Sequence, residues 1–270
     1  MLKKTGLLTL LVTVLLIVGL AGCGDNTKSD KKTILKVGAT AGPQAQILEA
    51  VKPVLAKDGV EMEIVEFNDY STPNTALNDG DINATSHQHK PFLDAQIKDR
   101  NYELVPLGKT ILMPMGLYSK KIKNLDELPN GATVAIPNDP SNGGRGLLLM
   151  QKFGLLKLNP EAGILPSVAD ITDNPKNLQI TEVDAAQAPR VLDDVDLVAV
   201  NTNYALVAGL NPTKDSLALE DKDSPYACVL VVRTRDKDNS ELLKLMKAYQ
   251  SPEVEKFIDD TFKGSIIKAW

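Results

Sequence analysis

The residue whose type and setting point most directly to binding chemistry is Arg145. It follows the run SNGG at 141–144 and comes at the start of a helix predicted over 146–153. At a helix start, a guanidinium fork and unpaired backbone N–H groups can face one anion together. A glycine turn followed by a surface arginine is the alternative interpretation. No Gly-Lys-Ser/Thr follows the glycines, so the run is not a P-loop and nucleotide binding has little support.

Two further polar side chains stand outside the predicted strands and could line a site. Asn201 directly follows the apolar run 197–200, and its amide could offer both a donor and an acceptor to a ligand. An ordinary cap or turn residue at a strand end is the alternative. Tyr70 lies in a predicted loop, where its ring could form the wall of a pocket or serve only for packing.

Histidine and cysteine are scarce: the chain has only His87, His89, Cys23 and Cys228. Imidazole and thiolate are competent metal ligands, but His-x-His with one remote cysteine is a weak signal. His89 and Cys228 could also imitate a Cys-His hydrolase pair, although no recognisable nucleophile motif surrounds Cys228. Since the chain shows no activated nucleophile and no carboxylate pair, we expect no enzyme activity and no cofactor.

The first 22 residues predict an export signal rather than part of a fold. Lys3 and Lys4 precede an apolar run at 7–18 that is too short to span a bilayer comfortably. The run leads through Leu-Ala-Gly into Cys23, which resembles the bacterial lipobox. We expect cleavage before Cys23, with diacylglycerol on its sulfur and a fatty acyl chain such as palmitate on its new amine. An ordinary signal peptide with an incidental cysteine is the alternative.

The segment after the lipobox predicts how the chain is held outside the cytoplasm. Residues 25–33 are rich in Lys, Asp and Ser with nothing to bury, so 23–33 is interpreted as a lipidated, flexible tether. Several acyl chains hold a soluble domain at a membrane without a transmembrane helix. We expect anchoring to the cell membrane or the outer membrane, facing the periplasm or the cell exterior.

The charge balance excludes nucleic acid as a partner. The formal net charge is −5, and it becomes −7 when Lys3 and Lys4 leave with the signal peptide. An acidic chain without a basic run is repelled by phosphate. With Cys23 lipidated, Cys228 has no partner for an internal disulfide, so stability must come from apolar cores.

Short apolar runs alternate with helix-like stretches along the rest of the chain. We predict strands over 35–40, 62–67, 83–86, 103–108, 115–119, 132–136, 179–183, 197–200 and 227–233. We predict helices over 44–57, 75–78, 146–153, 186–192 and about 241–249, and a last helix capped by Ser251 with Pro252 in its first turn. This rhythm is typical of an α/β protein.

Two polar segments mark predicted crossings between two lobes. They are 120–130 and 201–203, which divides the chain into one lobe of 34–119 with 204–270 and a second lobe of 120–203. Small ligands bind in clefts between lobes. A hinge that closes on a ligand also changes the surface that a partner meets. We expect the protein to be a monomer.

Long, ordered motifs cover nearly the whole mature chain. They are FNDY at 67–70, QHKPFL at 88–93, YSKKIKNLDELPNGATVAIPNDPSN at 118–142, ITDNPKNLQITE at 171–182, PRVLDD at 189–194, EDKDSPY at 220–226 and AYQSPEV at 248–254. In these motifs the chain resembles the methionine-binding lipoproteins of the NlpA and MetQ type. The resemblance implies an α/β fold with two lobes, the periplasmic-binding-protein type II fold, and an inter-lobe ligand cleft. It also implies a receptor that delivers methionine or a related amino acid to the permease of an ABC importer.

The same resemblance implies which residues contact the ligand. The implied positions are Tyr70, His87, His89, Arg145, Asn201 and Cys228. The chain departs from the family pattern at two of them. Phenylalanine normally precedes the QHKPFL motif, often with another aromatic before it, whereas Ser86 and His87 stand here. Asparagine normally occupies the position of Cys228.

These two departures leave the identity of the ligand open. Loss of an amide leaves one ligand group unpaired, at a cost of about 1 to 3 kcal/mol. A more polar amino acid or a short peptide is then favoured, and the double change of His87 to Phe and Cys228 to Asn should strengthen methionine binding. The alternatives are a surface lipoprotein with altered or lost ligand binding, serving as an adhesin or immunogen, and a metal-binding variant that uses His87, His89 and Cys228.

Overall fold

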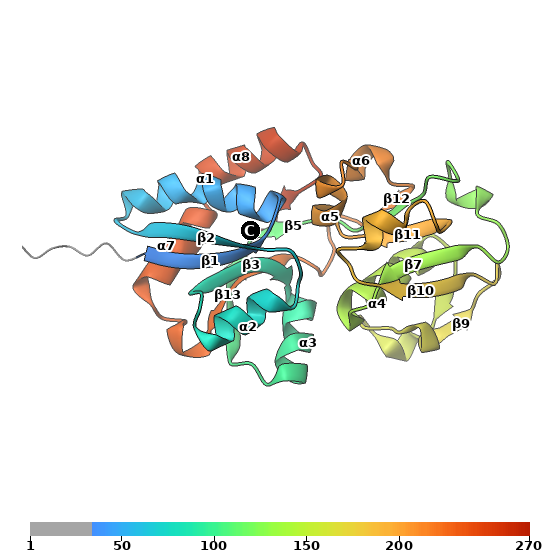
Figure 1. Cartoon of the computed structure of the whole chain (residues 1–270), viewed down its shortest axis with the longest axis horizontal. Coiled ribbons are helices and arrows are strands. Elements are labelled where there is room, and N and C mark those ends of the chain that lie inside the picture. Colours follow the sequence, from blue (N-terminus) through green and yellow to red (C-terminus); the bar gives the residue numbers. More distant parts are fainter. Residues whose placement is uncertain (1–33) are drawn as a thin grey trace, which may run out of the picture. The chain divides into compact units, whose positions relative to one another are not determined.

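The computed structural model describes residues 34–270 (Figure 1). The predicted signal peptide, Cys23 and the tether at 23–33 lie outside these residues. In the described range, no helix is both long and apolar enough to cross a membrane. The alternation of strands and helices confirms the predicted α/β class.

The first sheet has five strands in the order β2-β1-β3-β13-β4. Strand β1 is parallel to β2 and β3, whereas β13 is antiparallel to β3 and β4. The strands are β1 (Ile34–Thr40), β2 (Glu61–Phe67), β3 (Ala84–His89), β4 (Leu104–Lys109) and β13 (Cys228–Arg233). The helices that accompany this sheet are α1 (Pro43–Lys57), α2 (Thr72–Asp79), α3 (Lys90–Arg100), α7 (Ser240–Tyr249) and α8 (Pro252–Phe262).

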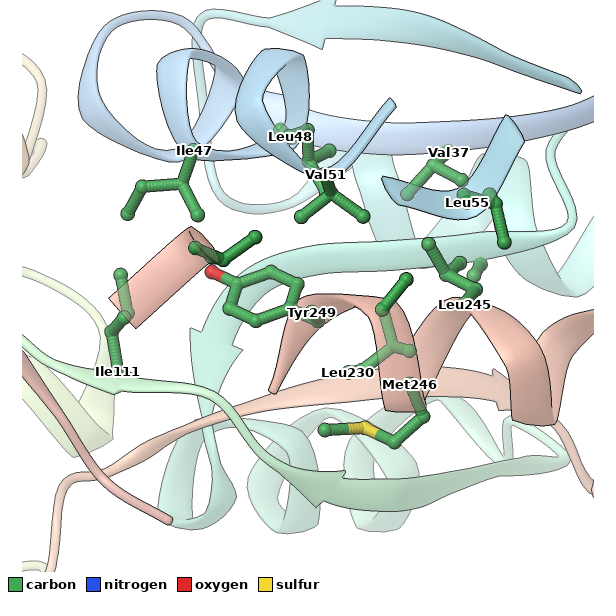
Figure 2. Close-up of a cluster of buried hydrophobic side chains, with 14 of the residues drawn as sticks. Val37, Ile47, Leu48, Val51, Leu55, Ile111, Leu230, Leu245, Met246 and Tyr249 are labelled. Atoms are coloured by element: carbon green, nitrogen blue, oxygen red, sulfur yellow. The ribbon is translucent and has the colours of Figure 1, made fainter. Parts of the chain in front are cut away.

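Both faces of the first sheet are buried, and β13 contributes to both. Leu230 and Val232 join the core formed with α1, α7 and α8, while Val229 and Val231 join the core formed with α2 and α3. Side chains alternate between faces along a strand, so the apolar run predicted at 227–233 supplies both cores. Figure 2 shows the first core, where the apolar side chains of α1 pack towards Tyr249 of α7.

The second sheet has five strands in the order β10-β7-β11-β6-β12. Strand β7 is parallel to β10 and β11, and β6 is antiparallel to β11 and β12. The strands are β6 (Gly116–Tyr118), β7 (Thr133–Pro137), β10 (Gln179–Val183), β11 (Leu197–Val200) and β12 (Ala218–Leu219), with helices α4 (Pro140–Lys152), α5 (Thr202–Val207) and α6 (Pro212–Asp215). Two short pairs complete the description: β5 (Ile111–Leu112) with β14 (Ile267–Lys268), and β8 (Lys157–Leu158) with β9 (Ile171–Asp173).

Strand pairing places both crossings between the lobes at other positions than the sequence predicts. Strand β6 pairs with β11, and β12 pairs with β6, so 116–118 and 218–219 belong to the second sheet. The predicted crossings at 120–130 and 201–203 therefore fall inside the range of that sheet. Pairing between distant strands has no local sequence signal, so the crossings were predicted from the polar segments alone. The pairing supports a first lobe of 34–112 with 228–270 and a second lobe of 116–219.

Two predicted helices differ from the observed elements. The stretch at 186–192 forms only a 3-10 turn, Ala188–Val191. The helix predicted over 146–153 begins at Pro140, capped by Asp139. Its glycines are needed for close packing: a Cβ on Gly143 would lie 2.6 Å from the oxygen of Pro137. Arg145 therefore lies inside the helix and does not open it.

Candidate ligand-binding site

Polar side chains gather where parallel strands of both sheets end. Tyr70 comes after β2, and His87 and His89 lie on one face at the end of β3. Asn201 comes directly after β11 in the second sheet. Cys228 begins β13 and stands opposite His89 in the antiparallel pair, so it lies at the same edge. In open α/β sheets, ligands bind outside the carboxyl ends of the strands.

These side chains line one cavity with about 350 Å³ of empty space, part of it open to solvent. Its lining residues are Tyr70, His87, Gln88, His89, Phe92, Met113, Asn142, Arg145, Asn201, Thr202, Asn203 and Cys228. The structure therefore brings together all six residues that the sequence singled out, and their part in binding remains a prediction.

Arg145 is buried and largely paired within the protein. Its Nε donates to Glu220 Oε1 at 3.0 Å, and its Nη2 donates to Glu220 Oε2 and, at 2.9 Å, to the carbonyl of Met113. The guanidinium carbon lies 4.5 Å from the ring centroid of Tyr226. These hydrogen bonds use Nε and Nη2, and none of them uses Nη1. Arg145 is thus not the free fork that the sequence suggested, but it keeps one edge that these bonds do not use.

The start of α4 offers no backbone anion site. Asp139 Oδ1 accepts from the backbone N–H of Asn142 at 2.9 Å, and the Asp139 carbonyl accepts from Gly143 N at 2.8 Å. The carboxylate of Asp139 already occupies the place an anion would take. The predicted contribution of backbone N–H groups beside Arg145 is therefore wrong, because the helix begins five residues earlier than Arg145.

A chain of amides fixes the orientation of Asn201. The Nδ2 of Asn142 donates to both oxygens of Asp139, at 3.1 and 2.9 Å, so Asn142 Oδ1 is left as an acceptor. That oxygen accepts from Asn201 Nδ2 at 2.7 Å. Asn201 therefore keeps its Oδ1 as a buried acceptor without a partner. Leaving such an atom unpaired costs about 1 to 3 kcal/mol, which a ligand N–H would recover.

A second unpaired group belongs to Asn203. The hydroxyl of Tyr70 donates to Asn203 Oδ1 at 2.5 Å, and Asn203 Nδ2 is buried without a partner. Burial raises the pKa of Tyr70 well above its usual value, so the phenol keeps its proton. Asn203 thus presents a donor where Asn201 presents an acceptor.

His89 is a neutral residue that joins the two sides of the cavity. Its Nδ1 accepts from the backbone N–H of Phe92 at 3.2 Å, so the proton is on Nε2, which donates to Asn142 Oδ1 at 3.1 Å. Burial and the nearby charge of Arg145 lower the pKa of His89 to about 3. Both nitrogens are used, and neither is available as a base at neutral pH.

His87 also uses both ring nitrogens within the protein. Its Nε2 donates to the carbonyl of Tyr70 at 3.2 Å, and its Nδ1 accepts from the Thr85 hydroxyl at 2.7 Å. Burial lowers its pKa to about 4. Its ring packs edge to face against Phe92, with centroids 6.3 Å apart. His87 therefore presents a neutral ring to the cavity, which removes one reason for expecting a polar ligand.

The arrangement of the described residues does not favour the metal-binding alternative. In residues 34–270, no cluster of three or more His, Cys, Asp or Glu side chains is arranged to hold a metal ion. Both nitrogens of His87 and of His89 are already hydrogen-bonded. Burial raises the pKa of Cys228 to about 12, so its sulfur is a thiol and not a thiolate.

Sequence reasoning missed three residues that shape this site: Asn142, Asn203 and Glu220. All three lie in segments that were noticed, two in family motifs and one in the polar tripeptide 201–203. Their roles depend on which atoms pair across long sequence distances. No spacing rule could have identified them.

Comparisons with known proteins agree with this architecture. The NlpA lipoprotein family profile matches residues 35–270. The D-methionine-binding lipoprotein MetQ of Salmonella typhimurium is 50% identical over 256 residues, 94% of each chain. The solved structure of a nutrient-binding protein from Burkholderia cenocepacia bound to methionine has 52% identity and a TM-score of 0.86, covering 87% of this chain and 100% of that one.

The crystal structure of the methionine-binding protein MetQ has 49% identity to this chain and a TM-score of 0.85, covering 88% of this chain and 98% of that one. These neighbours confirm the predicted two-lobe fold, and relatives of this kind are binding proteins, not enzymes. The match over almost the whole described range settles the relationship. The chain belongs to the NlpA lipoprotein family.

Proposed function

We propose that this protein is an extracytoplasmic receptor that binds methionine or a closely related amino acid and delivers it to the permease of an ABC importer. The observation that carries the proposal is the lining of one cavity, which contains both polar and apolar groups. The polar part of this lining includes buried atoms of Asn201 and Asn203 without partners, and the apolar part consists of rings and sulfur-containing side chains. An amino acid with an apolar side chain has the same division.

The polar part matches the zwitterionic end of an amino acid. The buried acceptor Asn201 Oδ1 suits an ammonium group, which has only donors. The Nη1 edge of Arg145 and the buried donor Asn203 Nδ2 suit a carboxylate, which has only acceptors. Each unpaired atom thus gains the partner that its chemistry requires.

The apolar part favours a side chain such as a thioether. It is formed by the rings of His87 and Phe92, together with Met113 and Cys228. Sulfur contacts with aromatic ring edges are favourable by about 0.3 to 1.5 kcal/mol. The relatives named for D-methionine, and the structural neighbour bound to methionine, support the same ligand class. A more polar ligand finds few unpaired groups here.

Attachment to a membrane through Cys23 belongs to the same proposal. The relatives are named lipoproteins, and the lipobox-like sequence ends at Cys23. The receptor would act as a monomer on the cell membrane or the outer membrane. Changing Cys23 to Ser should move the protein from the membrane fraction to the soluble fraction, and full membrane retention of the processed protein would contradict lipid anchoring.

The ligand is tested by native mass spectrometry of the purified protein, followed by calorimetry. The panel contains L- and D-methionine, leucine, serine and a Met-containing dipeptide, each with and without a chelator. We expect methionine to bind with a Kd below about 1 μM and serine at least about a hundredfold more weakly. Preference for serine or the dipeptide would overturn the choice of ligand. Loss of binding with chelator would restore the metal alternative.

A further inference from the structure

Arg145 and Glu220 form the most buried ion pair among residues 34–270. Their side chains are 3% and 12% exposed, and both oxygens of Glu220 accept from the guanidinium. Glu220 Oε2 also accepts from the backbone N–H of Met115 at 3.2 Å. Glu220 is therefore held by the chain and in turn holds Arg145.

The pair decides which edge of the guanidinium faces the ligand cavity. Arg145 lines both that cavity and a second hollow of about 660 Å³ of empty space. Glu220 and Tyr226 line the second hollow and not the ligand cavity. Glu220 thus lies on the side of the second hollow and bonds Nε and Nη2, and Nη1 is the nitrogen that the pair does not use.

The pair also sets the electrical balance of the cavity. Arg145 is the only side chain in its lining that is charged at neutral pH, because His87 and His89 are neutral. Glu220 cancels the charge of Arg145 at hydrogen-bonding distance. A zwitterion adds no net charge to this buried pair. An anionic ligand would add one uncompensated negative charge, which is costly in a low dielectric.

We propose that Glu220 is a positioning and specificity-determining residue: it aims the Nη1 edge of Arg145 at the cavity and restricts the ligand to zwitterions of zero net charge. The proposal deepens the amino-acid receptor function and rests on it. Glu220 itself does not touch the ligand. Its influence acts through the orientation and the charge of Arg145.

The charge part is tested with two ligands and the variant Glu220→Gln. The ligands are L-methionine and 4-(methylthio)butanoate, which keeps the carboxylate and thioether but lacks the ammonium group. We expect wild type to prefer methionine by at least about a hundredfold, and Glu220→Gln to reduce that preference at least about tenfold, because Arg145 is then uncompensated and favours an anion. The matched control is Glu182→Gln on the exposed side of β10, which should leave the preference unchanged.

The positioning part is tested with Glu220→Asp, which keeps the charge but shortens the side chain by one methylene. Both ligands should bind at least about tenfold more weakly, with their ratio unchanged. A ratio in Glu220→Gln equal to that of wild type would overturn the proposal. If Glu220→Gln does not fold by circular dichroism, Glu220→Asp decides, and unchanged affinity for methionine overturns the proposal. Absence of methionine binding to wild type would instead reject the amino-acid receptor function itself.

Discussion

The two walls of the cavity differ in whether their polar atoms have hydrogen-bond partners within the protein. On the wall from the first sheet, His87, His89 and the hydroxyl of Tyr70 all have protein partners. On the wall from the second sheet, Asn201 and Asn203 keep buried atoms without partners. A wall with its polar atoms satisfied recognises shape and apolar surface. A wall with unpaired atoms recognises hydrogen-bonding groups.

This difference separates the recognition of a side chain from the recognition of a zwitterion. Substitutions on the first wall should tune the preference among side chains, while substitutions on the second should affect all amino acids alike. The substitution of His87 for the family's phenylalanine belongs to the first kind. It replaces one ring by another, and both nitrogens of the new ring are hydrogen-bonded within the protein.

The largest effect is expected at Arg145 on the second wall. Arg145→Ala removes the donors for the ligand carboxylate and leaves Glu220 as a buried, unpaired charge. We expect methionine affinity to fall at least about a hundredfold, with a lower unfolding midpoint. Calorimetry and thermal unfolding measure the two effects. Arg100→Ala, on an exposed residue at the end of α3, is the control and should change neither.

The second-largest effect is expected from protonation of His87 and His89 on the first wall, which should destabilise the protein. The folded-state pKa values of His87 and His89 are about 4 and about 3, below the ordinary value of 6.5. Between pH 6.5 and these folded-state values, the unfolded chain binds more protons than the folded chain. The contribution of the two histidines to stability is therefore complete above pH 6.5 and falls as pH drops towards 4. Each histidine should lower the free energy of unfolding by about 2 to 3 kcal/mol at pH 4.5 relative to pH 7.

Urea unfolding at both pH values measures this loss, and His87→Phe provides the comparison. The variant should lose less stability than wild type over the same interval, because one buried imidazole is gone. Equal losses in the two proteins would mean that His87 is not a buried neutral group.

A smaller effect is expected at Asn201. Asn201→Ala removes the acceptor proposed for the ligand ammonium, and the free energy of binding should become less favourable by about 1 to 3 kcal/mol, or about tenfold to a hundredfold in Kd. Methionine and leucine should weaken by the same factor, since both carry the same zwitterion. Asn130→Ala, at an exposed position, serves as the control. A loss confined to methionine would contradict the division between the walls.

The smallest effect is expected from His87→Phe on methionine affinity. The added apolar ring surface is worth about 1 kcal/mol at most, so Kd should change by less than about fivefold. Calorimetry at pH 7 measures it. Improvement of tenfold or more would return support to the sequence-based interpretation, in which His87 makes the pocket polar.

Local signals in the sequence predicted much of the fold. The cap at Ser251, the buried run at 227–233 and the position of Asn201 after a strand all depend on neighbouring residues. The start of α4 was placed after Gly143 because the tight contact of this glycine with Pro137 is not local. The crossings were misplaced for the same reason, since β6 pairs with strands far along the chain.

The residues of the site were predicted, but the hydrogen-bond partners of their atoms were not. The resemblance identified the residues around the cavity, yet it could not say which of their atoms were already paired. Arg145 was expected to be free, and only the structure shows Glu220 on two of its nitrogens. His87 was expected to be polar, and only the structure shows Thr85 and the Tyr70 carbonyl on its ring.

A crystal structure of the protein with methionine tests the division of the cavity most directly. The carboxylate should lie about 2.7 to 3.2 Å from Arg145 Nη1, and the ammonium group at a similar distance from Asn201 Oδ1. The thioether should lie against the rings of His87 and Phe92. A ligand bound in the reverse direction, with its side chain at Arg145 and its ammonium group at His87, would contradict the proposal.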